Sequence, residues 1–244
     1  MNSGNPGSAI HWNEVIALYG GTFDPPHLGH REAVAGLFIE PGVRRVIILP
    51  SGTPPLKTTL ISSHHRVAMA RLAFGSDPYF PIPRDDIEID LCEIDRAKRD
   101  GQPGYTYDTL LHFRRTLAGK PLAFVIGADQ LRDLPRWSKF PEILGLSHWI
   151  VLERKPKGAE QAQAVLREWA ASGLIRPDPL GPGDRSWRTL SGTVIRRTET
   201  PARAVSSTQI REEIGRSGEP TPYSLLPAVI SYLKQNALYG TRAS

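Results

Sequence analysis

The sequence predicts an α/β protein built on a doubly wound, parallel sheet. Short apolar runs, typical of strands buried on both faces, alternate along the chain with longer segments whose apolar residues recur at helical spacing. Such alternation favours a parallel sheet with a helix after each strand. Because ligands of these sheets bind beyond the carboxyl ends of the strands, we expect the site in the loops that follow them.

The first predicted strand is residues 15–19, which are apolar throughout and end at a pair of glycines. A helix is expected to follow, with Asp24 as its N-cap and Pro25 in its first turn, and it carries His27 and His30. A second strand is predicted at residues 45–49, and the spacing of apolar residues predicts a helix at residues 64–74.

The middle of the chain continues the alternation. Residues 87–94 alternate between apolar and polar side chains and predict a strand, while residues 106–117 have helical spacing. Two further apolar runs, residues 122–126 and 149–152, predict buried strands, and residues 161–171 predict another helix. Residues 177–204 are interrupted by Pro, Gly and Arg, so that only a strand near residues 193–196 is expected there.

The C-terminal region predicts a small helical part at about residues 205–240. Ser206 and Gln209 have the spacing of a capping box, which indicates the start of a helix. Apolar side chains recur at helical intervals through residues 223–238, with Pro227 near the helix start. We expect a single domain over residues 14–240, preceded by a disordered extension at residues 1–13 that is rich in Asn, Ser and Gly.

Composition narrows the class of protein. The chain has 244 residues, of which 40% are hydrophobic, enough for one substantial core. The net charge of +5 suits anionic substrates, but the basic residues occur as scattered pairs, which argues against nucleic acid as a partner. A single cysteine, Cys92, excludes an internal disulfide. Without a signal peptide or an apolar stretch that could span a bilayer, we expect a soluble, cytoplasmic protein with no membrane partner.

The loop after residues 15–19 has the composition of a phosphate-binding loop. Gly20 and Gly21 let the backbone approach a ligand, and the following helix N-terminus offers N–H groups and partial positive charge. His27 and His30 are three residues apart, so they share a helix face near such an anion. A polar helix start or half of a zinc site would also carry two histidines. No acidic or cysteine ligands follow at metal-site spacing, and no protein-bound metal is expected.

Residues 21–30 read Gly-x-Phe-Asp-Pro-x-His-x-Gly-His, which resembles the signature of the nucleotidyltransferase superfamily with the His-x-Gly-His motif. The resemblance implies a Rossmann-like fold, attack on the α-phosphorus of a nucleoside triphosphate such as ATP, and release of pyrophosphate. It implies Mg²⁺ carried by the ATP phosphates and catalytic roles for His27 and His30. The residues expected to cradle the triphosphate are Gly20, Gly21, Thr22 and Phe23.

Residues 205–211, Val-Ser-Ser-Thr-Gln-Ile-Arg, resemble the Ile-Ser-Ser-Thr-x-Ile-Arg element of bacterial adenylyltransferases. Taken alone, this string is also consistent with an ordinary capped helix that carries an exposed arginine. The resemblance implies that Ser207, Thr208 and Arg211 hold the distal phosphates of ATP, and that Arg211 contributes to catalysis. Class I aminoacyl-tRNA synthetases have a lysine-rich second motif instead, which counts against that class.

Two strings, residues 104–110 and 127–137, resemble segments of the nicotinate mononucleotide adenylyltransferases. The resemblance implies that four of their residues contact the mononucleotide: Tyr105, Thr106, Asp129 and Trp137. From periodicity alone a core position is favoured for Trp137, and the resemblance reverses that preference, because a pyridinium ring is attracted to an indole face. Residues 54–57, Pro-Pro-Leu-Lys, are similar to that family's Pro-Pro-His-Lys loop. A phosphate contact is expected for Lys57, with an exposed surface lysine as the alternative. Leu56 replaces the histidine, whose role is not carried over.

The resemblance extends from about residue 15 to residue 239, with residues 177–204 unmatched. It implies transfer of the adenylyl group of ATP to nicotinate mononucleotide, giving deamido-NAD and pyrophosphate in NAD biosynthesis. Phosphopantetheine adenylyltransferases share the first signature but are shorter and lack the strings at residues 104–110 and 127–137. A non-catalytic nucleotide sensor is a further alternative, against which the intact histidine pair argues. The sequence distinguishes neither nicotinate from nicotinamide nor one oligomeric state from another.

Overall fold

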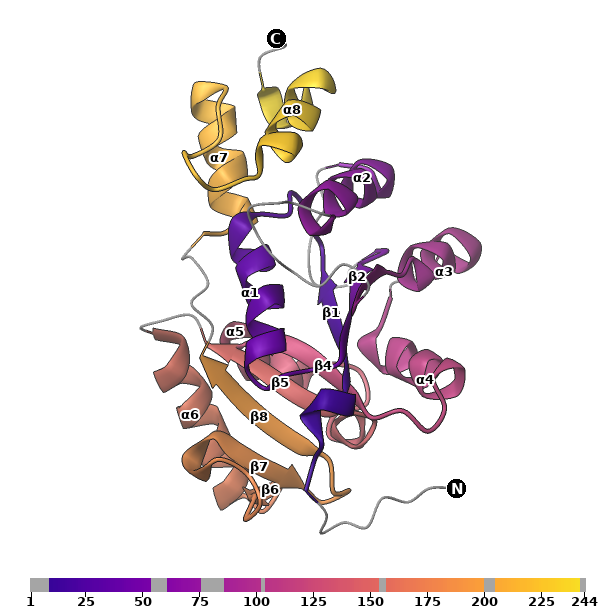
Figure 1. The fold of residues 1–244 in the computed structure, drawn as a ribbon, viewed down its shortest axis with the longest axis vertical. Coiled ribbons are helices and arrows are strands. Elements are labelled where there is room, and N and C mark those ends of the chain that lie inside the picture. The colour runs from indigo at the N-terminus through magenta and orange to yellow at the C-terminus, as the bar shows by residue number, and fades with distance from the viewer. Residues whose placement is uncertain are drawn as a thin grey trace. The chain divides into compact units, whose positions relative to one another are not determined.

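The order of elements in the computed structural model follows the hydrophobic pattern of the sequence (Figure 1). The structure describes residues 9–53, 61–75, 86–101, 104–153, 157–199 and 205–241, so Lys57 lies outside the described residues. The strands are β1 (Ile16–Gly21), β2 (Arg45–Pro50), β3 (Ile87–Ile89), β4 (Leu122–Gly127), β5 (His148–Glu153), β6 (Ile175–Pro177), β7 (Ser186–Thr189) and β8 (Val194–Glu199).

The helices lie between and after these strands. They are α1 (Leu28–Ile39), α2 (Ser63–Phe74), α3 (Cys92–Asp100), α4 (Thr106–Thr116), α5 (Ala128–Asp133), α6 (Lys157–Ala171), α7 (Ser207–Ser217) and α8 (Pro227–Gln235). Short 3₁₀ turns are η1 (Trp12–Glu14), η3 (Leu134–Arg136), η4 (Glu142–Gly145), η5 (Gly183–Arg185) and η6 (Leu238–Gly240). None of the helices among the described residues combines the length and apolar character that crossing a bilayer requires.

The strands form one eight-stranded sheet in the order β3-β2-β1-β4-β5-β8-β7-β6. The pairs β1–β4, β4–β5 and β5–β8 are parallel, which confirms the predicted fold class. The pairs β7–β8 and β6–β7 are antiparallel, and they come largely from the stretch in which the sequence showed little order. Leu18 and Ile150 are completely buried in neighbouring parts of this sheet, as expected of strands covered on both faces.

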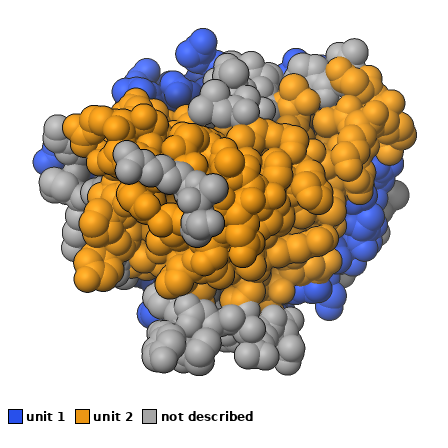
Figure 2. All heavy atoms as spheres, turned by 90° about the horizontal axis from the view of Figure 1, so that it is seen from above, with its two compact units in different colours: residues 1–19, 36–47, 105–201 blue, residues 20–35, 48–104, 202–244 orange. Residues whose placement is uncertain are grey.

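The chain divides into two compact units, coloured blue and orange in Figure 2. Unit 1 comprises residues 1–19, 36–47 and 105–201 and contains β4 to β8 with α4, α5 and α6. Unit 2 comprises residues 20–35, 48–104 and 202–244 and contains the loop after β1, the start of α1, and α2, α3, α7 and α8. The single domain over residues 14–240 and the disorder of residues 1–13 stay predictions.

The helix that carries His30 begins later than the sequence predicts. Because α1 starts at Leu28, the predictions of Asp24 as its N-cap and Pro25 in its first turn are wrong. The reason is steric, since a residue that precedes a proline is disfavoured in the helical region, and both Asp24 and Pro25 precede prolines. His27 takes the position before the helix, where its carbonyl accepts the N–H of His30 at 2.9 Å.

The strand predicted at residues 87–94 is wrong beyond Ile89. There β3 ends, and the N–H of Cys92 donates to Oδ1 of Asp90 at 2.7 Å, so that this side chain turns the backbone into α3. The helix ends at Gly101, which has a φ of 64°. Acidic residues in its first turn and basic residues in its last were the available sequence signal, because they complement the helix dipole.

The C-terminal helices follow the sequence pattern closely and carry the yellow end of the colour bar (Figure 1). The hydroxyl of Ser206 accepts the N–H of Gln209 at 3.2 Å, which confirms the predicted cap of α7. Pro227 is the first residue of α8, as expected. Helix α8 packs against α2, where the Tyr232 hydroxyl lies 2.9 Å from Nδ1 of His65.

Candidate active site

Gly20 and Gly21, predicted to follow the strand, are the last residues of β1, and Thr22 and Phe23 lead on to the residues before α1. Phe23 has a positive φ of 52°, and its side chain is 1% exposed. The ring lies over Gly21, where an added Cβ would come within 2.7 Å of it. Glycine is needed at position 21 because any side chain would meet this ring. The glycine pair thus lets the Phe23 ring lie close to the backbone. The sequence predicted a close approach of the same kind, but by a ligand.

The side chains of His27 and His30 contact each other directly. Their rings are stacked, with centroids 3.7 Å apart and an interplanar angle of 25°. The backbone N–H of His30 donates to Nδ1 of His27 at 3.3 Å, and the N–H of His27 donates to Nδ1 of His30 at 3.2 Å. Because each Nδ1 accepts a backbone N–H, this arrangement favours the tautomer with the proton on Nε2 whenever a ring is neutral. His27 precedes α1, so the two residues do not share a helix face as expected, but their rings lie together because they stack directly.

The surroundings of the pair hold it in place. His27 is 3% exposed, whereas His30 is only partly buried. The Phe23 ring packs edge-on against His30, with centroids 5.2 Å apart, and packs in the same way on Phe74 of α2. Side chains whose rotamers are fixed by such packing are suited to orient a reacting group.

The start of α7 contacts the loop before α1, although the two lie more than 180 residues apart in the chain. The Ser207 hydroxyl donates to the carbonyl oxygen of Pro25 at 2.8 Å, and Nη1 of Arg211 donates to the carbonyl of Asp24 at 2.7 Å. Nη2 of Arg211 also lies 3.4 Å from the Thr208 hydroxyl, which is exposed. The folded unit 2 therefore brings together the two strings that the sequence associates with the triphosphate.

Arg66 of α2 is a residue of this region that the sequence analysis missed. It is 1% exposed, and its guanidinium donates to the carbonyls of Thr22 at 2.8 Å, Ser51 at 2.8 Å and Gly52 at 3.2 Å. It thereby joins the loop after β1 to the loop after β2. Burial lowers the pKa of Arg66, while the nearby Asp24 carboxylate acts in the opposite direction. The available signal was a charged residue on the buried face of a helix.

Tyr239 of η6 was also missed. Its hydroxyl donates to Oδ1 of Asp24, a residue that is 2% exposed and lies three positions before His27. Burial and this hydrogen bond raise the pKa of the Tyr239 phenol, so it remains a donor at neutral pH. The sequence carried no signal for this contact, because its partners are 215 positions apart.

The residues predicted to contact the second substrate belong to unit 1. Tyr105 is the N-cap residue of α4 and is 42% exposed, and Thr106 is the first residue of that helix. Asp129 lies in the first turn of α5, directly after β4, where its carboxylate occupies the space that a Cβ on Gly127 would need. These residues thus stand at the ends of elements, as expected for ligand contacts in an α/β sheet.

Trp137 packs in the core and is also partly exposed, so its position is compatible with both core packing and a substrate contact. Its ring packs edge-on against Phe124 and Trp149, with centroids 6.4 Å and 6.5 Å away, so it belongs to an aromatic cluster of the core. The residue is nevertheless only partly buried. Such packing fixes the plane of the indole and leaves part of the side chain accessible.

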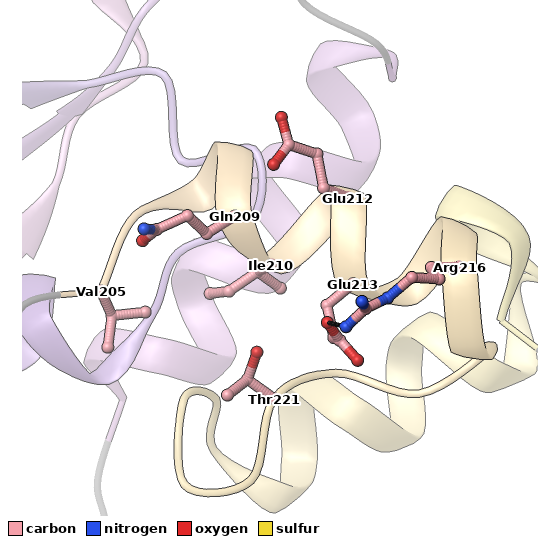
Figure 3. Close-up of a pocket in the computed structure, with 7 residues that line it drawn as sticks. All are labelled: Val205, Gln209, Ile210, Glu212, Glu213, Arg216 and Thr221. Atoms are coloured by element: carbon pink, nitrogen blue, oxygen red, sulfur yellow. Dashed lines mark hydrogen bonds and ion pairs between the residues drawn. The ribbon is translucent and has the colours of Figure 1, made fainter.

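A separate cavity of about 590 Å³ lies beside α7 (Figure 3). Its lining residues are Val205, Gln209, Ile210, Glu212, Glu213, Arg216 and Thr221, of which Glu213 and Arg216 form an ion pair. None of these was predicted to contact a substrate. The candidate site therefore rests on the contacts of the loop after β1 and the start of α7, and not on this cavity.

Comparison with known proteins places the chain among the enzymes that transfer nucleotides. Residues 18–213 match the family model described as Cytidylyltransferase-like, which sets the class of protein. The nicotinate-nucleotide adenylyltransferase of Salmonella typhimurium is 35% identical over 226 residues, which cover 91% of this chain and 97% of that protein. The chain belongs to the cytidylyltransferase-like family and, within it, to the nicotinate-nucleotide adenylyltransferases.

Solved structures support the fold. Plasmodium falciparum nicotinic acid mononucleotide adenylyltransferase complexed with NaAD superposes with a TM-score of 0.70 at 16% identity, over 95% of this chain and 100% of that one. The same protein complexed with APC gives a TM-score of 0.67 at 17% identity, with the same coverage. These likenesses confirm the predicted nucleotidyltransferase fold.

Proposed function

We propose that the protein transfers the adenylyl group of ATP to nicotinate mononucleotide, giving deamido-NAD and pyrophosphate. The observation that carries the proposal is the joining of the histidine loop to the start of α7 through Ser207 and Arg211. Membership of the nicotinate-nucleotide adenylyltransferase family supplies the acceptor. In this reaction a phosphate oxygen of the mononucleotide bonds to the α-phosphorus, and the bond to the β-phosphate oxygen breaks with its electron pair leaving on pyrophosphate.

The chain's role in this reaction is to position the substrates and to stabilise charge. The nucleophile is already an anion, so no general base is required. We assign the Nε2 atoms of His27 and His30 to the phosphate oxygens on which negative charge develops in the transition state. Backbone groups of residues 20–23 cradle the triphosphate, and a helix N-terminus suits its distal end. There Ser207, Thr208 and Arg211 are the proposed ligands.

The acceptor is assigned to residues of unit 1. Trp137 offers its indole to the pyridinium ring, an arrangement that is favourable between a cation and a π-system. Asp129 is suited to accept hydrogen bonds from ribose hydroxyls, and Tyr105 and Thr106 lie at a helix start, where N–H groups can bind the nicotinate carboxylate. A phosphate contact for Lys57 rests on the sequence alone.

Mg²⁺ is proposed to enter with ATP. Among the described residues there is no group of three or more His, Cys, Asp or Glu side chains that could hold a metal ion. Magnesium is commonly bound through substrate phosphates with few protein ligands, and the donors around residues 20–30 are suited to the phosphates themselves. When bound, the ion would neutralise charge on the phosphate oxygens.

The cellular setting is proposed as the cytoplasm, with ATP and nicotinate mononucleotide as small-molecule substrates and neither nucleic acid nor membrane as a partner. Cys92 is the single cysteine, and burial raises the pKa of its thiol. A thiol with a raised pKa is a poor nucleophile. We accordingly assign Cys92 no part in the reaction.

Pyrophosphate release tests the proposal. The protein is incubated with ATP and Mg²⁺ and, in parallel, with nicotinate mononucleotide, nicotinamide mononucleotide or phosphopantetheine. We expect the highest kcat/KM with nicotinate mononucleotide. A preference for phosphopantetheine would contradict the proposed acceptor, and no release with any of the three would indicate a nucleotide sensor.

Replacement of one histidine tests the mechanism. His30→Ala is expected to lower kcat by about 10²- to 10³-fold, the effect typical of losing one donor to a charged transition state. The matched control is His64→Ala, an exposed histidine of α2 in the same unit. Near wild-type turnover of His30→Ala, with a circular dichroism spectrum like that of the control, would remove His30 from the mechanism.

A further inference from the structure

The loop that precedes the histidine pair is contacted from the C-terminal region of the chain at two consecutive residues, Asp24 and Pro25. The side chain of Asp24 accepts the hydroxyl of Tyr239, and its carbonyl accepts Nη1 of Arg211 at 2.7 Å. The next carbonyl, that of Pro25, accepts the Ser207 hydroxyl at 2.8 Å. Three residues from the region after position 205 therefore contact two consecutive residues of this loop.

Arg211 and Ser207 belong to the string already assigned to ATP, whereas Tyr239 belongs to none of the motif strings and no role was predicted for it. Its ring is carried by η6, where Tyr239 itself has a positive φ of 57° and Ala237 one of 47°. The turn packs against both α7 and α8. Its backbone thus bends in a way that few non-glycine residues adopt, and the bend brings a phenol to Asp24.

The hydrogen bond has a physical reason, because a buried carboxylate requires donors. Asp24 is 2% exposed, and the guanidinium of Arg66 is near enough to stabilise its charge. Tyr239 adds a directional contact to one oxygen, Oδ1, which a long-range charge does not provide. Directional contacts at Asp24 restrict the backbone from which His27 and its stacked partner His30 extend.

We propose that Tyr239 is a positioning residue for the adenylyl transfer, which holds the histidine pair in its reactive geometry through Asp24. The inference rests on the proposed function of that pair. A displacement of a catalytic group by about 1 Å can cost on the order of 10²-fold in rate, so a second contact that fixes this loop affects turnover without touching either substrate.

The test removes one hydroxyl. Tyr239→Phe keeps the ring and deletes the donor to Asp24, and it is compared with Tyr232→Phe, which deletes a tyrosine hydroxyl that contacts His65 at 2.9 Å in the same unit. We expect kcat of Tyr239→Phe to fall by about tenfold or more, with the KM for nicotinate mononucleotide within about twofold of the wild type. Tyr232→Phe is expected to keep the wild-type kcat.

A second readout does not depend on turnover. Hydrogen–deuterium exchange of the backbone amides at residues 22–30 should become faster in Tyr239→Phe and stay unchanged in Tyr232→Phe, because only the first variant loosens this loop. Exchange at residues 22–30 equal to the wild type, or a kcat equal to that of Tyr232→Phe, would overturn the inference. If the unaltered protein released no pyrophosphate and Tyr239→Phe still exchanged faster at these residues, the proposed function alone would fail.

Discussion

Gly21 and Phe23 together support the side chain of His30, which is a proposed catalytic residue. Phe23 adopts a positive φ, which is uncommon for a bulky residue and places its ring both over Gly21 and against His30. In the sequence, the glycine indicates backbone freedom near a ligand. In the structure the same glycine also makes room for the ring that supports a proposed catalytic side chain.

Gly21→Ala should therefore impair both stability and turnover. The new Cβ would meet the Phe23 ring at 2.7 Å, and the forced shift would be passed on to His30. We expect the free energy of unfolding to fall by about 1–3 kcal/mol, as for other overpacked sites. Urea unfolding measures the free energy of unfolding, and pyrophosphate release shows whether kcat falls as well.

Gly215→Ala is the matched control for this substitution. Gly215 lies in α7, where an added Cβ has no atom within 4 Å, so that alanine should stabilise the helix by up to about 1 kcal/mol and leave turnover unchanged. Wild-type stability and turnover in Gly21→Ala would contradict the assigned role of the ring contact.

Elements differ in how far their own sequence determines them. Helix α7 begins where its capping box predicts, because the Ser206 cap involves residues three positions apart. Within residues 87–94, predicted to be a strand, α3 begins at Cys92 because the side chain of Asp90 accepts the backbone N–H of Cys92. Such a local hydrogen bond stabilises a turn even where alternating apolar residues predict a strand. The antiparallel strand β7 was not predicted, since its pairing with β8 and β6 is set by partners outside its own four residues.

The junction between β5 and β8 contains a titratable group with a shifted pKa. His148 opens β5, and its Nδ1 accepts the N–H of Val194 in β8 at 3.0 Å. Burial lowers the pKa of His148 to about 4, and the charge of Arg188 acts in the same direction, while the Asp178 carboxylate opposes it. Arg188 and Asp178 pair with each other at 2.9 Å and are themselves buried.

Stability should consequently fall as the pH is lowered from about 6.5 to about 4. In this window the unfolded chain takes up a proton at His148 that the folded chain does not, so protonation favours unfolding. The full loss is on the order of 3 kcal/mol. Urea unfolding at several pH values measures it, and His148→Asn, which retains an acceptor for the Val194 amide, should show a smaller loss in this range. An equal loss in the variant would assign the pH dependence to other groups.

At the scale of the whole molecule, the residues proposed for the two substrates come from separate parts of the chain. The triphosphate is assigned to residues of unit 2 and the mononucleotide mainly to residues of unit 1. The described residues offer donors for phosphate but no cluster of three or more His, Cys, Asp or Glu side chains for a resident metal. The proposed function accordingly has Mg²⁺ enter with ATP, which leads to a testable expectation.

Chelation by EDTA distinguishes a metal that is carried by ATP from a metal that is bound by the folded protein. Excess EDTA should abolish pyrophosphate release, and added Mg²⁺ should restore it, because the triphosphate is held as its magnesium complex. The Tm should stay the same with and without EDTA, since a ligand stabilises a fold only when the folded state binds it. A Tm that fell markedly on chelation would indicate a resident metal site instead.

What the sequence by itself determined about this protein is its local structure and the identity of its motifs. The buried strands, the cap of α7 and the proximity of His27 to His30 follow from residues a few positions apart, whose spacing reports directly on the local backbone. The α/β class followed from their alternation. The family resemblance added the reaction to these local features.

Only the tertiary structure decided which distant residues support the histidine pair. Arg66 joins two loops by their carbonyls, and Tyr239 reaches Asp24 across 215 positions. The sequence pattern could place Arg66 on the buried face of a helix, but it identifies the partners of neither residue, because a hydrogen bond between distant segments depends on how the elements pack. The start of α7 reaches the loop before α1 for the same reason, through Arg211.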